Sequence, residues 1–282
     1  MKILIKRNQI FHYSPLRYPG GKTFLFPFFD KIIKANGLRN ITYVEPFAGG
    51  AGVALALLFS ERVESIIIND FDRAIYSFWK SAVFDADRFI KKIISTPITI
   101  KEWKKQKAIY NNHQTGQFEY GFATFFLNRT NISGILDGGP IGGLDQKGKW
   151  KIDARFNKKK LAERIRRLSL YKNRISVFNK DGVELIDDYL NKANTFIYLD
   201  PPYYEKGASL YLNHYKKNDH KILAKRLNQS PDAFWVITYD NRKEIKSLYP
   251  KRQIVKFSLN YNAYKSRIGK EVMILSDAIA TQ

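Results

Sequence analysis

Short apolar runs alternate with polar turns in the first part of the chain. Residues 41–44 and 63–68 are the first two runs, and their composition predicts short buried strands. Between them, a glycine turn at 49–52 leads into the apolar stretch 53–58, which predicts a helix. A strand, a glycine turn and a helix in this order are typical of the start of a nucleotide-binding α/β unit.

The same pattern returns in the second half of the chain. The apolar runs 195–199 and 233–238 have the composition of strands that are buried on both faces of a parallel sheet, and 174–178 is strand-like. The C-terminal region predicts a β-hairpin with strands at 253–259 and 271–275. The expected fold class is therefore α/β, with a doubly wound Rossmann-like sheet and a C-terminal β-hairpin.

The middle of the chain differs in composition from both ends. It is rich in Lys, Asn, aromatic residues and glycine, and it begins with a predicted helix at 73–84. The stretch 134–148 contains six glycines and one proline, so it predicts loops or hairpins. Residues 150–154 alternate large and polar side chains like an exposed strand.

These differences suggest two domains. We expect residues 1–72 and 161–282 to form a catalytic α/β domain. Residues 73–160 would be an insertion made of α-helices and a β-hairpin.

The charge of the chain indicates a polyanionic partner. Lys and Arg number 48 against 26 Asp and Glu, which gives a net charge of +22. Nucleic acid is the usual partner of so basic a protein. An anionic membrane surface is the alternative, but the basic residues are spread along the chain and are not gathered on one amphipathic helix.

Other features of the composition exclude several kinds of site and of protein. The chain has no cysteine, which excludes disulfides and cysteine-based zinc sites and is compatible with a cytoplasmic location. The four histidines have no metal-ligand spacing, so no metal is expected. No apolar run is long enough to span a bilayer, and the apolar stretch at the start is too short for a signal peptide.

The glycine turn after the first predicted strand is a candidate ligand site. Residues 45–52 read Glu-Pro-Phe-Ala-Gly-Gly-Ala-Gly, and such glycines let a backbone approach a ligand closely in front of a helix N-terminus. Asp70 ends the second strand, where an acidic residue meets ribose hydroxyls in related folds. The structural alternatives are a plain turn for the glycines and a helix cap for Asp70.

A second glycine motif precedes the first strand. Gly20-Gly21-Lys22-Thr23 invites a phosphate-loop interpretation, but that motif needs a glycine where the chain has Leu16, and no strand leads into it. Lys22 beside two glycines still offers a cation over a flexible backbone. It could neutralise a carboxylate such as that of methionine.

The motif Asp200-Pro201-Pro202-Tyr203 decides the chemistry. It follows the predicted strand 195–199 directly, so a carboxylate, a rigidly held carbonyl and an aromatic ring meet at the carboxyl end of a sheet, where α/β proteins bind ligands. Methylation of an aromatic amine requires this set. Two acceptors that hold the two amine hydrogens localise the nitrogen lone pair, and the ring supports the base. The structural alternative is a proline turn with a capping Asp.

These motifs resemble the Dam-type (D12 class) DNA adenine N6-methyltransferases over nearly the whole chain. The matching segments are Leu16–Lys22, Glu45–Gly52, Asn69-Asp70, Phe125–Arg129, Val177–Asp181 and Asp200–Tyr203. Two positions depart from the family pattern: Tyr18 stands where tryptophan is frequent, and Ala51 replaces the last glycine of the cofactor loop.

The resemblance implies a site-specific DNA-methyltransferase that transfers a methyl group from S-adenosylmethionine to a flipped-out adenine in double-stranded DNA. It assigns the insertion to target recognition and implies, as catalytic residues, Asp200, Pro201, Pro202 and Tyr203. The cofactor-binding residues that it implies are Tyr18, Lys22, Phe47, Asp70, Phe178, Asp181 and Asp200. A restriction endonuclease that acts on the same site would be a further partner.

The recognised DNA sequence does not follow from the resemblance. Members that recognise GATC carry a basic residue where this chain has Asp137, and Ile132 and Ser133 replace an aromatic residue and an amide. We therefore expect a recognition site other than GATC. The candidate DNA-binding residues are Arg129, Asn131, Lys149 and Arg155.

Two alternative functions stay open at this point. Cytosine-N4 methylation uses the same chemistry on the same kind of amine, although the family associates Tyr203 with adenine. A non-catalytic nucleic-acid-binding protein would also explain the charge of +22, but it would need neither the cofactor loop nor Asp70.

Overall fold

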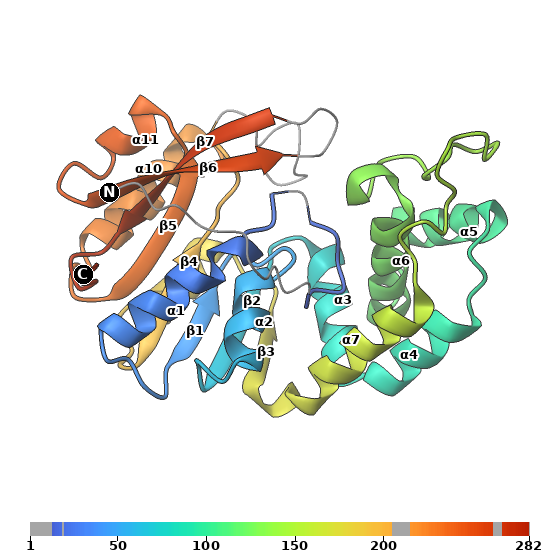
Figure 1. Cartoon of the computed structure of the whole chain (residues 1–282), viewed down its shortest axis with the longest axis horizontal. Helices are drawn as coiled ribbons and strands as arrows, with labels where there is room; N and C mark the ends of the chain where they lie inside the picture. Colours follow the sequence, from blue (N-terminus) through green and yellow to red (C-terminus); the bar gives the residue numbers. More distant parts are fainter. Residues whose placement is uncertain (1–12, 19, 205–214, 262–266, 282) are drawn as a thin grey trace. The chain divides into compact units, whose positions relative to one another are not determined.

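The computed structural model describes most of the chain. The described residues are 13–18, 20–204, 215–261 and 267–281. They form two compact units, the first made of Lys22–Asp72 and Phe178–Gln282 and the second of His12–Gly21 and Arg73–Val177 (Figure 1).

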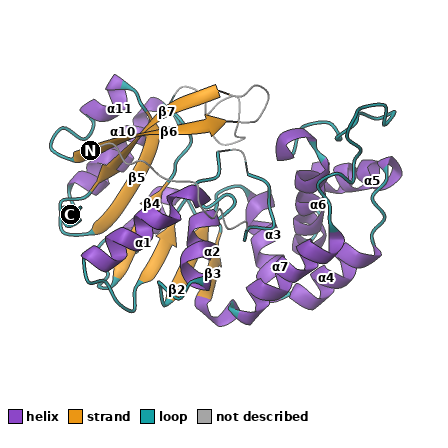
Figure 2. Cartoon of the chain, in the orientation of Figure 1, coloured by secondary structure: helices purple, strands orange, loops and turns teal. Residues whose placement is uncertain are grey.

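The described strands form one seven-stranded sheet in the order β3-β2-β1-β4-β5-β7-β6 (Figure 2). Their bounds are β1 Thr42–Glu45, β2 Ser65–Asn69, β3 Ile175–Phe178, β4 Thr195–Leu199, β5 Phe234–Asp240, β6 Gln253–Tyr261 and β7 Arg267–Leu275. Strand β1 pairs in parallel with β2 and β4, and β4 pairs in parallel with β5. Strand β7 is antiparallel to both β5 and β6. The predicted α/β sheet with a C-terminal hairpin is confirmed.

Helices cover both faces of the sheet in the first unit. They are η1 Thr23–Leu25, α1 Phe26–Ala35, α2 Gly52–Phe59, α8 Gly182–Asp187, α10 Lys217–Asn228 and α11 Lys243–Ser247. On one face, Phe29 of α1 contacts the rings of Tyr43 and Tyr198, with centroids 5.9 and 4.8 Å apart. On the other face, Val44 and Ile197 share a core with buried residues of α8, α10 and α11. Because successive strand side chains point to opposite faces, this arrangement makes the sheet doubly wound.

The second unit is mainly helical. Its elements are α3 Arg73–Phe84, α4 Ala86–Ser95, α5 Ile100–Asn111, α6 Gln117–Thr130, η2 Ile132–Gly134, α7 Lys158–Leu170 and η3 Lys172–Arg174. Helix α6 is buried along most of its length, and its Phe125 stacks on Phe78 of α3 with ring centroids 5.9 Å apart. Compared with the predicted insertion at 73–160, this unit extends to Val177, so it contains all of α7, η3 and most of β3, and it also contains the segment 12–21. Helix α7 packs against α4 and α3, which explains why it belongs here.

The glycine-rich segment after α6 is not a hairpin, and the predicted strand at 150–154 is wrong. The described backbone from 135 to 157 consists of turns, with one isolated bridge between Asn131 and Pro140. The Gln146 side chain explains the difference. Its Nε2 donates to the Ile141 carbonyl at 2.8 Å and its Oε1 accepts from the Ile152 backbone N–H at 2.8 Å. A side chain thereby binds the backbone groups that a partner strand would otherwise pair.

Gly121 allows the close approach of α6 to α3. A Cβ at this position would lie 2.3 Å from the Ser77 carbonyl oxygen, which belongs to the backbone and cannot rotate away. We expect Gly121→Ala to lower the free energy of unfolding by about 2–3 kcal/mol, measured by urea denaturation. Gly139→Ala is the matched control, because a Cβ at Gly139 has no neighbour within 4 Å. Equal losses in the two variants would contradict this account.

Candidate active site

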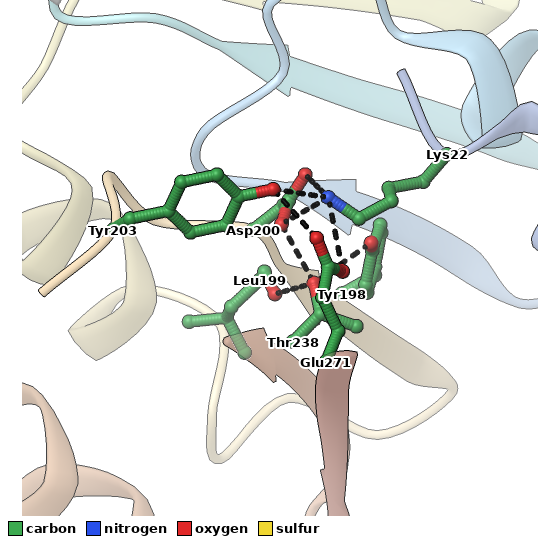
Figure 3. Close-up of polar contacts among 7 residues, drawn as sticks. All are labelled: Lys22, Tyr198, Leu199, Asp200, Tyr203, Thr238 and Glu271. Atoms are coloured by element: carbon green, nitrogen blue, oxygen red, sulfur yellow. Dashed lines mark hydrogen bonds and ion pairs between the residues drawn. The ribbon is translucent and has the colours of Figure 1, made fainter. Parts of the chain in front are cut away.

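Asp200 lies at the carboxyl end of β4, where the two prolines end the strand. Pro201 and Pro202 have no backbone N–H, so the hydrogen-bond ladder of β4 cannot continue past Leu199. The Asp200 side chain keeps 25% of its surface exposed. Its Oδ1 accepts a hydrogen bond of 2.7 Å from the Thr238 hydroxyl on the neighbouring strand β5 (Figure 3). The carboxylate is therefore oriented by the sheet and still open to a ligand.

Lys22 contacts both carboxylate oxygens of Asp200. Its Nζ lies 3.1 and 3.0 Å from the two carboxylate oxygens of Asp200 and 3.5 Å from Oε2 of Glu271, and the residue is only 5% exposed. Burial alone would lower the pKa of Lys22, but the charges of Asp200 and Glu271 and hydrogen bonds to both raise it above its ordinary value. Lys22 is therefore a protonated, buried cation between two carboxylates.

Glu271 joins the same cluster from β7, and sequence reasoning missed it. It is 1% exposed, and its Oε1 accepts a hydrogen bond of 2.7 Å from the Tyr203 hydroxyl. The same hydroxyl lies 3.3 Å from Nζ of Lys22. One signal was present in the sequence: Glu271 is an acidic residue at the head of the apolar run Val272–Leu275, and such a residue is rarely buried unless it is paired.

The side chains of Lys22, Asp200, Tyr203 and Glu271 point toward one another, and we call these four residues the ion cluster (Figure 3). Two carboxylates face one ammonium, so the ion cluster carries an excess negative charge at its exposed member, Asp200. Such a site favours a ligand that is positively charged or that donates hydrogen bonds.

The glycine turn after β1 is held by two carboxylates. Oε1 of Glu45 accepts from the Ala54 backbone N–H at 2.9 Å, and burial raises the pKa of Glu45 to about 8. Oδ2 of Asp70 accepts from the Gly49 N–H at 2.9 Å. Gly49 has a φ of 46°, a left-handed conformation that suits glycine. The turn is thereby fixed before any ligand binds.

Asp70 is half-buried and has backbone contacts on both carboxylate oxygens. Its Oδ1 accepts from the Asp72 N–H at 2.9 Å, as in the capping alternative. Burial, followed by the charge of Asp72, raises the pKa of Asp70 to about 7, while the Gly49 and Asp72 N–H groups act in the opposite direction. Because each carboxylate oxygen has two lone pairs, both oxygens can also accept from a ligand hydroxyl.

Asn69 links the glycine turn to the loop after β3. Its Nδ2 donates to the Pro46 and Lys180 carbonyls at 2.9 and 3.0 Å, and its Oδ1 accepts from the Lys180 N–H at 2.8 Å. Asn69 belongs to a segment that matches the family, but the resemblance implies no role for its side chain. The structure makes it the residue that holds two loops of the first unit together.

The aromatic candidates lie in these two loops. The Phe47 ring contacts the Tyr215 ring at 5.4 Å, and a Cβ on Gly182 would lie 2.4 Å from it. Phe178 is half-buried at the end of β3, and its carbonyl accepts from the Asp70 N–H at 3.3 Å. Asp181 caps α8 by accepting from the Val183 N–H at 2.8 Å. Phe178 thus ends β3, and Phe47 and Asp181 lie just after the carboxyl ends of β1 and β3.

Tyr18 and the candidate DNA-binding residues belong to the second unit. The Tyr18 carbonyl accepts from the Gly21 N–H at 3.1 Å. Lys149 is exposed, with its Nζ 5.9 Å from the ring of Trp150, which is 62% exposed. Arg129 donates from Nε to the Arg155 carbonyl at 2.8 Å.

Asn131 is fully buried in the second unit. Its amide donates to the Ile135 and Leu136 carbonyls, and its oxygen accepts from the Trp103 ring N–H at 2.7 Å. These contacts occupy the groups with which an asparagine recognises a base. We therefore assign Asn131 to the internal structure of the loop and no longer to direct contact with DNA.

In the described part of the chain, no group of three or more histidine, aspartate or glutamate side chains is arranged to hold a metal ion. The helices in the described part of the chain are too short or too polar to cross a membrane.

Known proteins resemble this chain in sequence and in fold. The sequence model of a family described as "D12 class N6 adenine-specific DNA methyltransferase" matches residues 18–263. The chain is 24% identical over 222 residues to the Type II methyltransferase M.MjaIII of Methanocaldococcus jannaschii. The aligned region covers 72% of this chain and 73% of the relative. Among solved structures, the rRNA methyltransferase aviRa from Streptomyces viridochromogenes overlaps 97% of this chain and 92% of its own, with 14% identity and a TM-score of 0.39. That overlap is too loose to support an argument about function.

Proposed function

Because the chain belongs to the D12 class N6 adenine-specific DNA methyltransferases, we propose that it methylates the N6 amino group of an adenine flipped out of duplex DNA. S-adenosylmethionine would supply the methyl group as an electrophilic sulfonium. The observation that carries the proposal is the partly exposed Asp200 carboxylate, which the ion cluster orients at the carboxyl end of the sheet.

Asp200 would hold the attacking amine. Its Oδ2 accepts only from Lys22 among the contacts described above, so it retains a lone pair for one amine hydrogen. The Pro201 carbonyl would accept the second hydrogen, and Tyr203 would support the base. As the nitrogen bonds to the methyl carbon, the carbon–sulfur bonding pair leaves with sulfur. The methylated nitrogen then releases one proton to Asp200 or to water.

Lys22 takes a different role from the one expected. Its Nζ is buried between Asp200 and Glu271, so we propose Lys22 as a positioning residue of Asp200 and not as the partner of the methionine carboxylate. Glu271 would position Tyr203 in the same way through its hydrogen bond to the Tyr203 hydroxyl.

The residues around the glycine turn fit the methyl donor. The fixed turn with its left-handed Gly49 and the open lone pairs of Asp70 suit a ribose. Phe47 and Phe178 supply apolar surface for an adenine, and Asp181 supplies an acceptor beside them. We propose these residues as the cofactor site of the first unit. Tyr18, which the resemblance names as a further cofactor residue, stays a prediction.

The second unit would recognise DNA. Its described part carries a strongly exposed Trp150 beside Lys149, as expected of a surface that contacts nucleic acid. We propose that the recognised DNA sequence differs from GATC. We also propose that the protein acts in the cytoplasm, where its DNA substrate lies. The likeness to a Type II methyltransferase supports pairing with a restriction endonuclease of the same specificity.

The test uses the purified chain, unmethylated duplex DNA and tritium-labelled S-adenosylmethionine. We expect the label in N6-methyladenine after digestion to nucleosides. Label confined to cytosine would favour the cytosine-N4 alternative and overturn the proposal. Single-molecule sequencing of DNA from a host that expresses the chain identifies the target, and methylation confined to GATC would contradict the proposed specificity.

Asp70 provides a prediction for the cofactor site. We expect Asp70→Ala to raise the KM for S-adenosylmethionine by roughly 10- to 100-fold with little change in the KM for DNA, because charge-assisted hydrogen bonds contribute about 1.5–3 kcal/mol. Asp188→Ala is the control, since Asp188 is an exposed residue of the same unit and is paired with Lys180. An unchanged KM for the cofactor would remove Asp70 from the proposed site.

A further inference from the structure

Four arginines from separate segments converge in the second unit. Arg17 precedes the first helix, Arg129 lies near the end of α6, Arg155 follows the glycine-rich segment, and Arg164 lies on α7. Burial, and then the charges of Arg17, Arg164 and Arg155, lower the pKa of Arg129 to about 9. Arg129 therefore lies within electrostatic range of the other three arginines.

The guanidinium groups of three of these arginines are held by backbone carbonyls. Arg17 donates from Nη1 to the Asn131 carbonyl at 2.9 Å, and Arg164 donates from Nη1 to the Ser14 carbonyl at 2.9 Å. Arg129 donates to the Arg155 carbonyl from Nε at 2.8 Å and also from Nη2. In the described part of the chain, no carboxylate lies within ion-pair distance of any of the four. Neutral carbonyls orient these cations without neutralising them.

Within the described part of the chain, most of the donor groups of these arginines make no hydrogen bond. A guanidinium has five N–H bonds, and the contacts above use one each in Arg17 and Arg164 and two in Arg129. Arg155 is exposed, and the other three are half-buried. A concentration of unneutralised guanidinium groups with free N–H bonds matches the oxygen geometry of a phosphate group.

The position of Arg17 is fixed by the fold and does not depend on a ligand. The Asn128 side chain accepts from the Arg17 N–H at 2.7 Å and donates to the Arg17 carbonyl at 2.8 Å, and Asn128 itself is 2% exposed. Gly134 packs against the same carbonyl, where a Cβ would lie only 2.6 Å away. The segment that carries Arg17 is thereby attached to α6, next to Arg129.

We propose that Arg17, Arg129, Arg155 and Arg164 form a preassembled clamp for a phosphate group of the DNA backbone. The inference rests on the proposed function for the identity of the ligand and adds two residues, Arg17 and Arg164, to the DNA-binding surface. It also changes the role of Arg129 and Arg155. Phosphate contacts fix the position and orientation of a protein on the duplex and do not distinguish one base from another.

The test compares two arginines of the same helix. Arg164 belongs to the clamp, whereas Arg166 is an exposed residue of α7 outside it, so Arg166→Gln is the matched control for Arg164→Gln. Binding of the full chain to a labelled duplex is measured by fluorescence anisotropy over a range of salt concentrations, on two unrelated DNA sequences. Thermal unfolding of both variants checks that they fold.

We expect Arg164→Gln to weaken binding by about tenfold on both duplexes and to lower the slope of log K against log salt by about 1, as for one lost phosphate contact. Arg166→Gln should leave the slope unchanged. Inorganic phosphate should raise the Tm of the unsubstituted protein more than chloride at equal ionic strength, and this difference should shrink in Arg164→Gln.

Equal slopes for the two variants, or a loss confined to one DNA sequence, would overturn the clamp. The methylation assay separates this failure from a failure of the proposed function. If the unsubstituted protein binds duplex DNA with the predicted salt dependence and transfers no methyl group to it, the proposed function is wrong and the clamp stands. If methylation proceeds and Arg164→Gln binds as the control does, the clamp is wrong and the proposed function stands.

Discussion

Asp200→Ala should lower kcat for methyl transfer by roughly a thousandfold while DNA binding changes by less than about threefold. The loss follows because the side chain would hold the amine in the transition state, and removing one such preorganised group typically costs 10²- to 10³-fold in rate. Binding survives because the DNA-binding surface is proposed to lie in the second unit. Single-turnover methylation and fluorescence anisotropy measure the two quantities separately.

The substitution is compatible with folding because of Glu271. In the Asp200→Ala variant, Lys22 keeps Glu271 as a partner, so one buried ammonium still faces one buried carboxylate. Loss of rate therefore cannot be attributed to an unpaired lysine. A variant that methylates DNA at the normal rate would rule out the proposed role of Asp200.

Thr238→Val tests a weaker perturbation of the same carboxylate. It removes the 2.7 Å hydrogen bond that orients Asp200 and leaves the carboxylate in place. We expect an intermediate loss of kcat, about tenfold, with an unchanged KM for DNA. This intermediate effect would distinguish orientation of Asp200 from its mere presence.

Local patterns were sufficient to predict the sheet. The run 195–199 coincides with β4, because Thr195 and four large apolar or aromatic residues, followed by Asp200 and two prolines, leave few alternatives to a buried strand. The hairpin strands β6 and β7 were recognised in the same way, although both are longer than predicted. The position of Asp200 followed from β4 directly.

Contacts between distant segments could not be predicted in this way. Lys22 and Glu271 lie near opposite ends of the chain, and neither carries a local sign that it binds the other. The error at 150–154 has a related cause: alternation predicted a strand, but Gln146 binds the backbone of this segment with its side chain. Pairings of this kind become visible only when the fold brings the residues together.

Lys22→Met should destabilise the first unit by about 3–5 kcal/mol in urea denaturation at neutral pH. The substitution keeps an unbranched side chain, one atom shorter than that of lysine, and removes the ammonium that lies between Asp200 and Glu271. Breaking a buried ion pair by removing one partner is costly because it leaves an uncompensated charge. Most of the lost stability would come from the buried charge of Glu271, because Glu271 is 1% exposed and Asp200 still reaches solvent.

A second substitution tests whether charge or packing causes the loss. Glu271→Gln removes the buried negative charge and preserves an acceptor oxygen for the Tyr203 hydroxyl. In the Lys22→Met background, we expect it to restore at least about 2 kcal/mol of the lost stability, although the same substitution alone should be destabilising. A double-mutant cycle measures this coupling. If the two losses simply add, packing and not charge explains the effect of Lys22.

The pH dependence should separate the two explanations again. In the unsubstituted protein, Lys22 has a raised pKa, so its contribution to stability is complete below the ordinary lysine pKa and is lost only as pH rises through the raised value. The ion cluster should therefore be stable throughout the neutral range. In Lys22→Met, the two carboxylates no longer share an ammonium. Because protonation of a carboxylate removes the excess negative charge, the stability deficit should shrink as pH falls. A loss of stability that does not change with pH would mean that packing, and not charge, holds the ion cluster together. Lys22 would then have no electrostatic part in orienting Asp200.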